Sequence, residues 1–478
     1  MTLNPELKRN LWLELSLERL IAMPVVLGLL FWVMTLVSGH VALASVSIAA
    51  FHLLVLLWGS RRAARGVSDE LRAGTWDDQR MSPIDAWSMA WGKLVGATIF
   101  VWYGGAFCLA VFIGARVQQG GFLTWDNAVI NLSFMTSLIV LGLLAQSVAL
   151  TASLAFLQKR RLERRLSVTF SQIIGLAVAA YAGALVFREF FIDLGTMAKF
   201  GETIRWFGHG IDFMPFALLS LGAFLGWAFL GLYRLMQVEL QYRIRPWAWV
   251  CFSIFAMVYA AGLLHDELVS NHLDDLLKLV VPFVIAAAGV YLIFFLEPKN
   301  TVQLRKWIAA VQGRSWSGFW RLTPNWILAL ALLWIVGLLQ IVILIGQDVQ
   351  LPEPVRWLGV SIGEVSSIWV FAVLLFVCRD ILLLLYLNLS RTKGKPDTTG
   401  IIYLAVLYGL LPPLVTVLGG HSLLPIVVPY PSDNFLLVVV PVSLQIAAIG
   451  YICRRAWNSQ HPERTVQLSG GSSGASGE

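Results

Sequence analysis

The sequence predicts an all-α, polytopic membrane protein with about twelve transmembrane helices, arranged as two fused six-helix halves. Of its 478 residues, 58% are hydrophobic and only 13% are charged. A soluble domain is about half apolar and about a quarter charged. Apolar runs of about 20 residues, the length that crosses a bilayer, recur along the chain. They lie near 20–37, 41–58, 94–115, 129–156, 168–187, 213–233, 247–264, 278–296, 325–346, 365–388, 400–418 and 435–453.

The basic residues predict the orientation of these spans. With both termini inside, the segments on the inner side hold 28 of the 35 Lys and Arg residues, the outer loops hold six, and Arg379 falls within a span. The outer loops also hold 13 of the 28 acidic residues. Lys and Arg favour the cytoplasmic side, so we expect a multi-pass protein of a bacterial-type cytoplasmic (inner) membrane. The net charge of +7 then reflects topology in contact with membrane lipid, and indicates no nucleic-acid partner.

The two halves share an order of features. In each, the fourth span is followed by a short basic loop and a Thr-containing start of the fifth span. We assign the first half to 20–240 and the second to 247–455, with chance likeness of apolar segments as the alternative. An amphipathic segment, 1–19, precedes the first span, and the Gly/Ser-rich tail at 467–478 has the composition of a linker.

A polar stretch, "ELRAGTWDDQRMSP", separates the second and third spans at 70–83. Thr75 is followed three residues later by Asp78, and Ser82 is followed by Pro83 and then by Asp85. A hydroxyl, an acid in the first turn and proline at the first position are typical of helix starts. We therefore predict a short helix that begins at Thr75 and stops before Ser82, where the next helix starts.

Such a helix offers contacts to a partner at the end of the bundle. Trp76 provides a rigid apolar side chain, while Asp77, Asp78 and Arg80 provide charged ones. The alternative is a solvated loop whose capping residues have no further role.

The sequence from Glu70 to Leu94, which includes this stretch, resembles the coupling segment of type-2 ABC transporter permeases. The positions that match the family pattern are Glu70, Gly74, Thr75, Ser82, Pro83, Gly92 and Lys93. The segment 1–19 is similar to the family's interfacial elbow helix, and the loop at 188–212 is similar to its extracytoplasmic re-entrant helices. In the second half, the corresponding loop lacks the Gly-Thr and Ser-Pro pairs.

The resemblance implies the permease subunit of an ATP-driven exporter, with 70–82 as its coupling helix. The partners it implies are cytoplasmic ABC ATPase subunits, in two copies, with an additional periplasmic or membrane subunit left open. The implied ATPase-contact residues are Glu70, Gly74, Thr75, Trp76, Asp77, Asp78, Arg80, Ser82 and Pro83.

The chain itself shows no motif for ATP binding or catalysis. The sequence nearest to a phosphate-binding loop, Gly92-Lys93-Leu94, lacks the Ser or Thr that holds magnesium. We therefore expect no catalytic residue, no metal site and no cofactor in this chain, with ATP and Mg²⁺ bound by the partner subunit.

Three polar residues within the spans are candidates for a role inside the bundle. They are Arg379, Asp380 and Gln146. Charges at membrane depth face other helices or a cavity. Because sequence neighbours point about 100° apart on a helix, we expect Arg379 and Asp380 to pair with other helices rather than with each other. A structural ion pair is favoured over contact with substrate.

Other classes remain possible from the sequence. A twelve-span secondary transporter is one alternative, although the loop "GSRRAARGVSDE" lacks the acid of the major-facilitator pattern. A permease-like membrane scaffold without transport is another. A membrane-embedded enzyme needs polar residues that converge at one depth, and none are evident. The sequence does not indicate the exported substrate.

Overall fold

We analysed a computed structural model of the chain. It describes residues 4–159, 164–192, 203–242, 246–263, 273–297, 299, 301–345, 349–357, 360–390, 396–432 and 434–459. The tail at 467–478 lies outside the described residues. The chain divides into two compact units, with the main boundary between Arg245 and Pro246, and each unit is described by itself.

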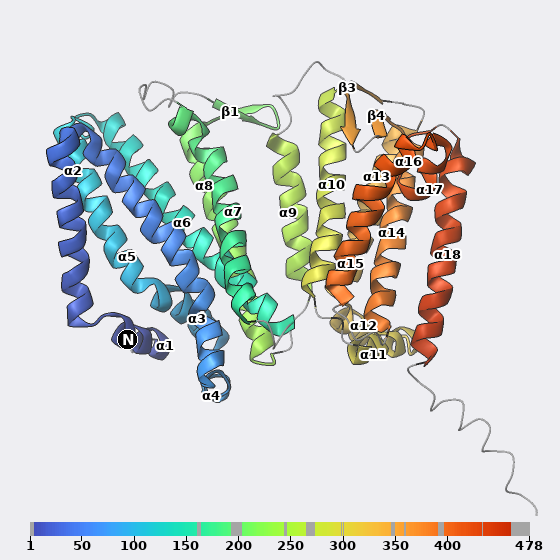
Figure 1. Cartoon of the computed structure of the whole chain (residues 1–478), viewed down its shortest axis with the longest axis horizontal. Helices are drawn as coiled ribbons and strands as arrows, with labels where there is room; N and C mark the ends of the chain where they lie inside the picture. The colour runs from blue at the N-terminus through green and yellow to red at the C-terminus, as the bar shows by residue number, and fades with distance from the viewer. Residues whose placement is uncertain are drawn as a thin grey trace, which may run out of the picture. The chain divides into compact units, whose positions relative to one another are not determined.

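The first unit is a bundle of long helices (Figure 1). Its helices are α1 (Pro5–Glu14), α2 (Leu17–Phe51), the π-helix η1 (His52–Trp58), α3 (Gly59–Ala73), α4 (Trp76–Met81), α5 (Ala86–Gln118), α6 (Trp125–Lys159), α7 (Arg164–Ile192) and α8 (Phe213–Glu239).

The second unit is also helical. Its helices are α9 (Trp247–Leu263), α10 (Leu273–Leu296), α11 (Thr301–Gln312), α12 (Trp316–Leu322), α13 (Asn325–Leu344), α14 (Ser367–Leu389), α15 (Pro396–Ala405), the π-helix η3 (Val406–Leu410), α16 (Leu411–Val417), the 3-10 turn η4 (His421–Leu423), α17 (Leu424–Val427) and α18 (Phe435–Ser459).

The chain is an all-α, polytopic membrane protein. Among the described residues, nine helices are long and apolar enough to cross a membrane. Three shorter apolar helices, Val168–Gly183, Trp247–Leu263 and Val280–Leu296, lie where the sequence predicts the other three spans. The nine and the three together account for the twelve predicted positions.

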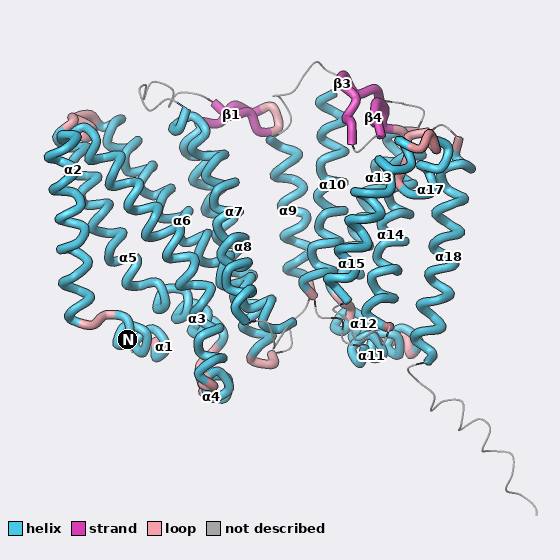
Figure 2. The backbone as a smooth tube through the Cα atoms, viewed as in Figure 1, coloured by secondary structure: helices cyan, strands magenta, loops and turns pink. Residues whose placement is uncertain are grey.

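Among the residues that the structure describes, strands occur only in two small antiparallel hairpins (Figure 2). In the second unit β3 (Val349–Trp357) pairs with β4 (Val360–Val365). The other hairpin joins β1 (Thr203–Trp206) to β2 (His209–Asp212). It falls in the loop predicted to hold re-entrant helices, so that prediction is wrong for 203–212, and 193–202 lie outside the described residues. Phe207 and Gly208 both have positive φ, at 49° and 78°, as a two-residue hairpin turn requires.

Each unit has a pair of short helices at one end of its long helices. In the first unit, α1 and α4 both lie at the end of the bundle where α3 finishes and α5 begins (Figure 1). In the second unit, α11 and α12 lie at the end of α10 and α13 that is remote from β3 and β4 (Figure 1). These ends carry the loops that the sequence marks as rich in basic residues.

Candidate functional site

The predicted short helix is present as α4, which covers Trp76–Met81. Gly74 ends α3 in the left-handed conformation, with φ 75°, and its backbone N–H donates to Glu70 O. Only glycine adopts this conformation without steric cost. The chain can therefore reverse within one residue and begin α4 at once.

The capping residues differ from the prediction. The Thr75 side chain accepts no hydrogen bond from α4, and its hydroxyl instead donates to Glu70 O at 3.4 Å. Ser82 is the C-cap of α4 rather than the start of α5, and its hydroxyl donates to Gln79 O at 2.6 Å. Ser82 precedes Pro83 and has an extended backbone, which ends α4. An N-cap residue also has an extended backbone, but residues 83–85 are not helical, so the next helix does not begin at Ser82.

The N-cap of α5 is Asp85. Its carboxylate accepts the backbone N–H groups of Trp87 and Ser88, each at 3.1 Å. A hydrogen bond from Ser88 also lowers the pKa of Asp85. The negative carboxylate is a stronger acceptor than the Ser82 hydroxyl, and it favours the positive end of the helix dipole. The N-cap of the helix that contains the third span therefore lies three residues later than predicted.

Trp76 does not face outward. Its side chain is only 3% exposed, and it packs in an apolar cluster with Val67, Met89 and Leu94. The indole also lies 5.0 Å from the ammonium of Lys93. The expectation that Trp76 offers its ring to a partner is therefore wrong, because the apolar ring is more stable against α3 and α5 than in water.

The exposed side chains of α4 are acidic or flexible. Asp77 is 81% exposed as a side chain, Asp78 is exposed, and Met81 lies beside them on the surface. Arg80 instead points back to the bundle, where its Nε donates to Glu239 O at 3.0 Å, at the end of α8. Of the nine predicted contact residues, four lie on α4. Asp77 and Asp78 are exposed on the surface, whereas Trp76 and Arg80 attach the helix to the bundle.

Beneath α4 lies a cluster of charged side chains around Lys93, which is 1% exposed. The Lys93 ammonium donates to Glu6 Oε1 at 3.0 Å and to Gln79 Oε1 at 2.8 Å, and it also pairs with Glu70. Arg9 pairs with Glu6 at 2.9 Å and with Glu70. Two cations and two carboxylates therefore balance, and they join α1, α3, α4 and α5. We call these four residues with Gln79 the Lys93 cluster.

Close packing holds α1 against α5 on the same side. A Cβ on Gly92 would lie 2.8 Å from Glu6 Cβ, and a Cβ on Gly96 would lie 2.6 Å from Asn10 Cβ. Both distances are shorter than van der Waals contact, so only glycine allows this approach. Asn4 Nδ2 also donates to Ser88 O at 2.6 Å. The segment predicted as an interfacial elbow is thus docked along the start of the third span.

Sequence reasoning identified Glu70, Gly92 and Lys93 by family pattern, but it missed Glu6, Arg9 and Gln79. A signal was available in Lys93 itself. A lysine at the start of an apolar run must be neutralised if it is buried, so the sequence predicts a carboxylate partner for Lys93 but does not specify which acid provides it.

Gln146 is buried and stabilises the π-helix η1. Its side-chain amide donates to Val55 O at 3.1 Å and accepts from Trp102 Nε1 at 2.9 Å. Gly59, directly after η1, leaves room for this amide. A π-helix leaves carbonyls without their usual partners, so Gln146 has a structural role in the first unit.

Arg379 and Asp380 form a buried network in the second unit. Contrary to prediction they pair with each other, with Arg379 Nη2 2.7 Å from Asp380 Oδ1. The long arginine side chain folds back along α14, which overcomes the 100° between the two residues. Asp380 Oδ2 also accepts from Tyr291 at 2.7 Å and from Tyr408 at 2.6 Å.

The Arg379 guanidinium also donates hydrogen bonds to residues other than Asp380. Arg379 Nη1 donates to Gln445 Oε1 at 3.1 Å, and Nη2 donates to the Tyr408 hydroxyl at 2.9 Å. Tyr408 lies in the π-helix η3. Because both oxygens of Asp380 are occupied by protein donors, the network stabilises α10, α14, η3 and α18 and offers no vacant acceptor for a substrate.

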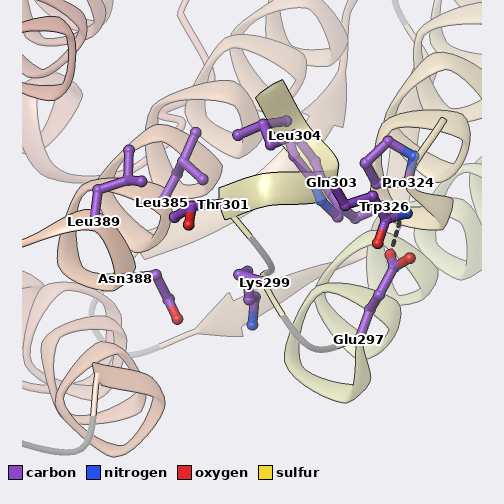
Figure 3. Close-up of a pocket in the computed structure, with 10 residues that line it drawn as sticks. All are labelled: Glu297, Lys299, Thr301, Gln303, Leu304, Pro324, Trp326, Leu385, Asn388 and Leu389. Carbon is purple, nitrogen blue, oxygen red and sulfur yellow. Dashed lines mark hydrogen bonds between the residues drawn. The ribbon is translucent and has the colours of Figure 1, made fainter. Parts of the chain in front are cut away.

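A small pocket lies in the second unit beside the start of α11 (Figure 3). Glu297 accepts the backbone N–H groups of Asn325 and Trp326, each at 3.2 Å, and so caps α13. Burial raises the pKa of Glu297. Lys299, on the other side, pairs with Asp397 at 3.1 Å. The charged groups of the pocket are therefore engaged in joining α10 to α13 and α15.

Comparison with family models, with curated proteins and with solved structures finds no match to this chain. The features that point to a function are therefore the membrane-spanning fold and the geometry of α4 and the Lys93 cluster.

Proposed function

We propose that the chain is the transmembrane permease subunit of an ATP-driven exporter in a bacterial-type cytoplasmic membrane. Its sequence resembles type-2 ABC transporter permeases between the second and third spans. Separate ATPase subunits, in two copies, bind ATP and Mg²⁺ and act on α4, which lies at the cytoplasmic end of the first unit.

The observation that supports this proposal best is the attachment of α4 to the spans. The helix exposes Asp77, Asp78 and Met81, while Trp76 and Gln79 reach into the bundle and contact Lys93. A surface loop has no need of such an attachment. A helix that a partner subunit displaces must be attached to the spans that move with it.

The Lys93 cluster provides that coupling. The pair between Lys93 and Glu6 is buried, with the two side chains 1% and 3% exposed, so separating these two charges costs several kcal/mol. Displacement of α4 is therefore transmitted to α5 and α1 as a unit. Arg80 extends the connection to α8 through Glu239 O. Movement at one short helix thus reaches α1 and the third and sixth spans of this half.

A photo-crosslinking residue at Asp78 tests the proposal in cells. We expect an adduct with a soluble subunit that carries a phosphate-binding loop. The matched control is the same residue at Glu18, an exposed acid in the first turn of α2, which should give no such adduct. Absence of an ATPase adduct from position 78, or equal adducts from both positions, would contradict the proposal.

Hydrolysis provides a second test. The purified chain should hydrolyse no ATP, whereas the complex with its ATPase should hydrolyse ATP and lose coupling to transport when α4 is detached. ATP hydrolysis by the isolated chain, with contaminating enzymes excluded, would refute this assignment of roles.

A further inference from the structure

The connection between α10 and α13 is strongly basic. Between Glu297 and Asn325 the sequence holds five Lys and Arg residues and no acid. Lys299 is paired with Asp397. For the other four, no carboxylate lies within 4.0 Å in the part of the chain that the structure describes. These four cations are Arg305, Lys306, Arg314 and Arg321.

Tryptophan contacts place these helices at the level where two spans begin. The Trp320 ring of α12 stacks on Trp247, with centroids 5.3 Å apart, and Trp247 is the first residue of α9. Trp307 Nε1 of α11 donates to the Thr323 hydroxyl at 3.1 Å, two residues before α13. Tryptophans concentrate where the apolar part of a membrane protein meets water, so α11 and α12 lie at that boundary.

The two helices also present apolar side chains beside the cations. None of the residues of α11 or α12 is buried. Trp316 is 75% exposed and Trp320 40%. Exposed tryptophan next to Lys and Arg is the composition of helices that lie in the headgroup layer of a bilayer. A polybasic segment next to a span binds anionic lipid through charge complementarity.

We propose that α11 and α12 form a binding surface for the headgroups of anionic phospholipids. The four cations bind the lipid phosphates, and Trp316 inserts among the headgroups. The first unit has no equivalent at α4, whose exposed charges include Asp77 and Asp78. The proposal is independent of export, since it requires only that the chain spans a bilayer.

Lipid titration of the full chain in detergent tests this surface. Bound phosphatidylglycerol is counted by native mass spectrometry, with phosphatidylcholine as the neutral lipid. The variant Arg305→Gln/Arg314→Gln/Arg321→Gln removes three cations. Each cation near an anionic surface contributes about fivefold to binding, so we expect the affinity for phosphatidylglycerol to fall at least tenfold, with phosphatidylcholine unaffected.

The charge-preserving variant Arg305→Lys/Arg314→Lys/Arg321→Lys is the control and should retain binding. Both variants should unfold at the temperature of the unchanged chain, because the three side chains are exposed. Unchanged phosphatidylglycerol binding in the Gln variant would overturn the proposal. The proposal would also be overturned if the Gln variant bound phosphatidylglycerol normally but no longer copurified with a protein partner, because the surface would then bind an acidic protein.

Discussion

Replacing Lys93 by methionine should release α1 from the first unit. Methionine fills similar space but leaves Glu6 and Glu70 with only Arg9 as counter-ion. Removing one partner of a buried ion pair costs about 3–5 kcal/mol. The remaining Arg9 places this case near the lower value, about 3 kcal/mol, which corresponds to a population of detached α1 about 100-fold higher.

Limited proteolysis measures that population. Chymotrypsin should cleave at the exposed Trp12 of α1, but only when the helix unfolds locally, so the cleavage rate follows the detached fraction. We expect cleavage about 100-fold faster in Lys93→Met. Lys8→Met, which removes an exposed cation of the same helix, should change the rate by less than about twofold.

A second change separates charge balance from packing. In Lys93→Met/Glu70→Gln the remaining charges, Glu6 and Arg9, again neutralise each other, so cleavage should slow relative to Lys93→Met alone. If Lys93→Met is cleaved at the rate of the unchanged chain, the cluster does not hold α1. If the double variant is not slowed, the unpaired charge is not the cause.

Three further predictions concern single sites. Trp76→Ala should destabilise the first unit by about 3–5 kcal/mol, whereas Trp316→Ala, at an exposed position, should change the unfolding temperature little. Equal decreases in unfolding temperature for the two variants would show that Trp76 is not a core residue. Arg379→Met should cost about 3–5 kcal/mol by leaving Asp380 buried and unpaired, and Arg379→Met/Asp380→Asn should recover part of it in detergent unfolding. The pKa of Glu297 is higher in the folded than in the unfolded state. The stabilisation of the fold that the protonated side chain provides is therefore complete below the unfolded pKa and is lost as the pH rises through the folded pKa. The unfolding temperature of Glu297→Gln minus that of the unchanged chain should therefore increase from about pH 4 to about pH 8. A difference that does not change with pH would show that the pKa of Glu297 is not raised.

The sequence by itself determined where the chain crosses the membrane and where α4 lies. Span positions follow from the length of apolar runs, since every backbone polar group in a bilayer must be paired within a helix. The bounds of α4 follow from local stereochemistry, with Gly74 ending α3 and Pro83 forcing Ser82 to be extended. The start of α5 was misplaced because Ser82 and Asp85, three residues apart, are both residue types that cap helix starts.

Only the tertiary structure decided which polar residues meet. Lys93 is neutralised by Glu6, 87 residues earlier in the chain, and nothing local to Lys93 specifies that partner. Trp76 was predicted to offer an apolar contact to a partner, yet its ring is buried between α3 and α5. Arg379 and Asp380 pair with each other because the side chain of arginine is long enough to fold back. Ion pairs depend on distances of a few ångströms between helices, and those distances are determined by packing across the whole unit rather than by any single segment.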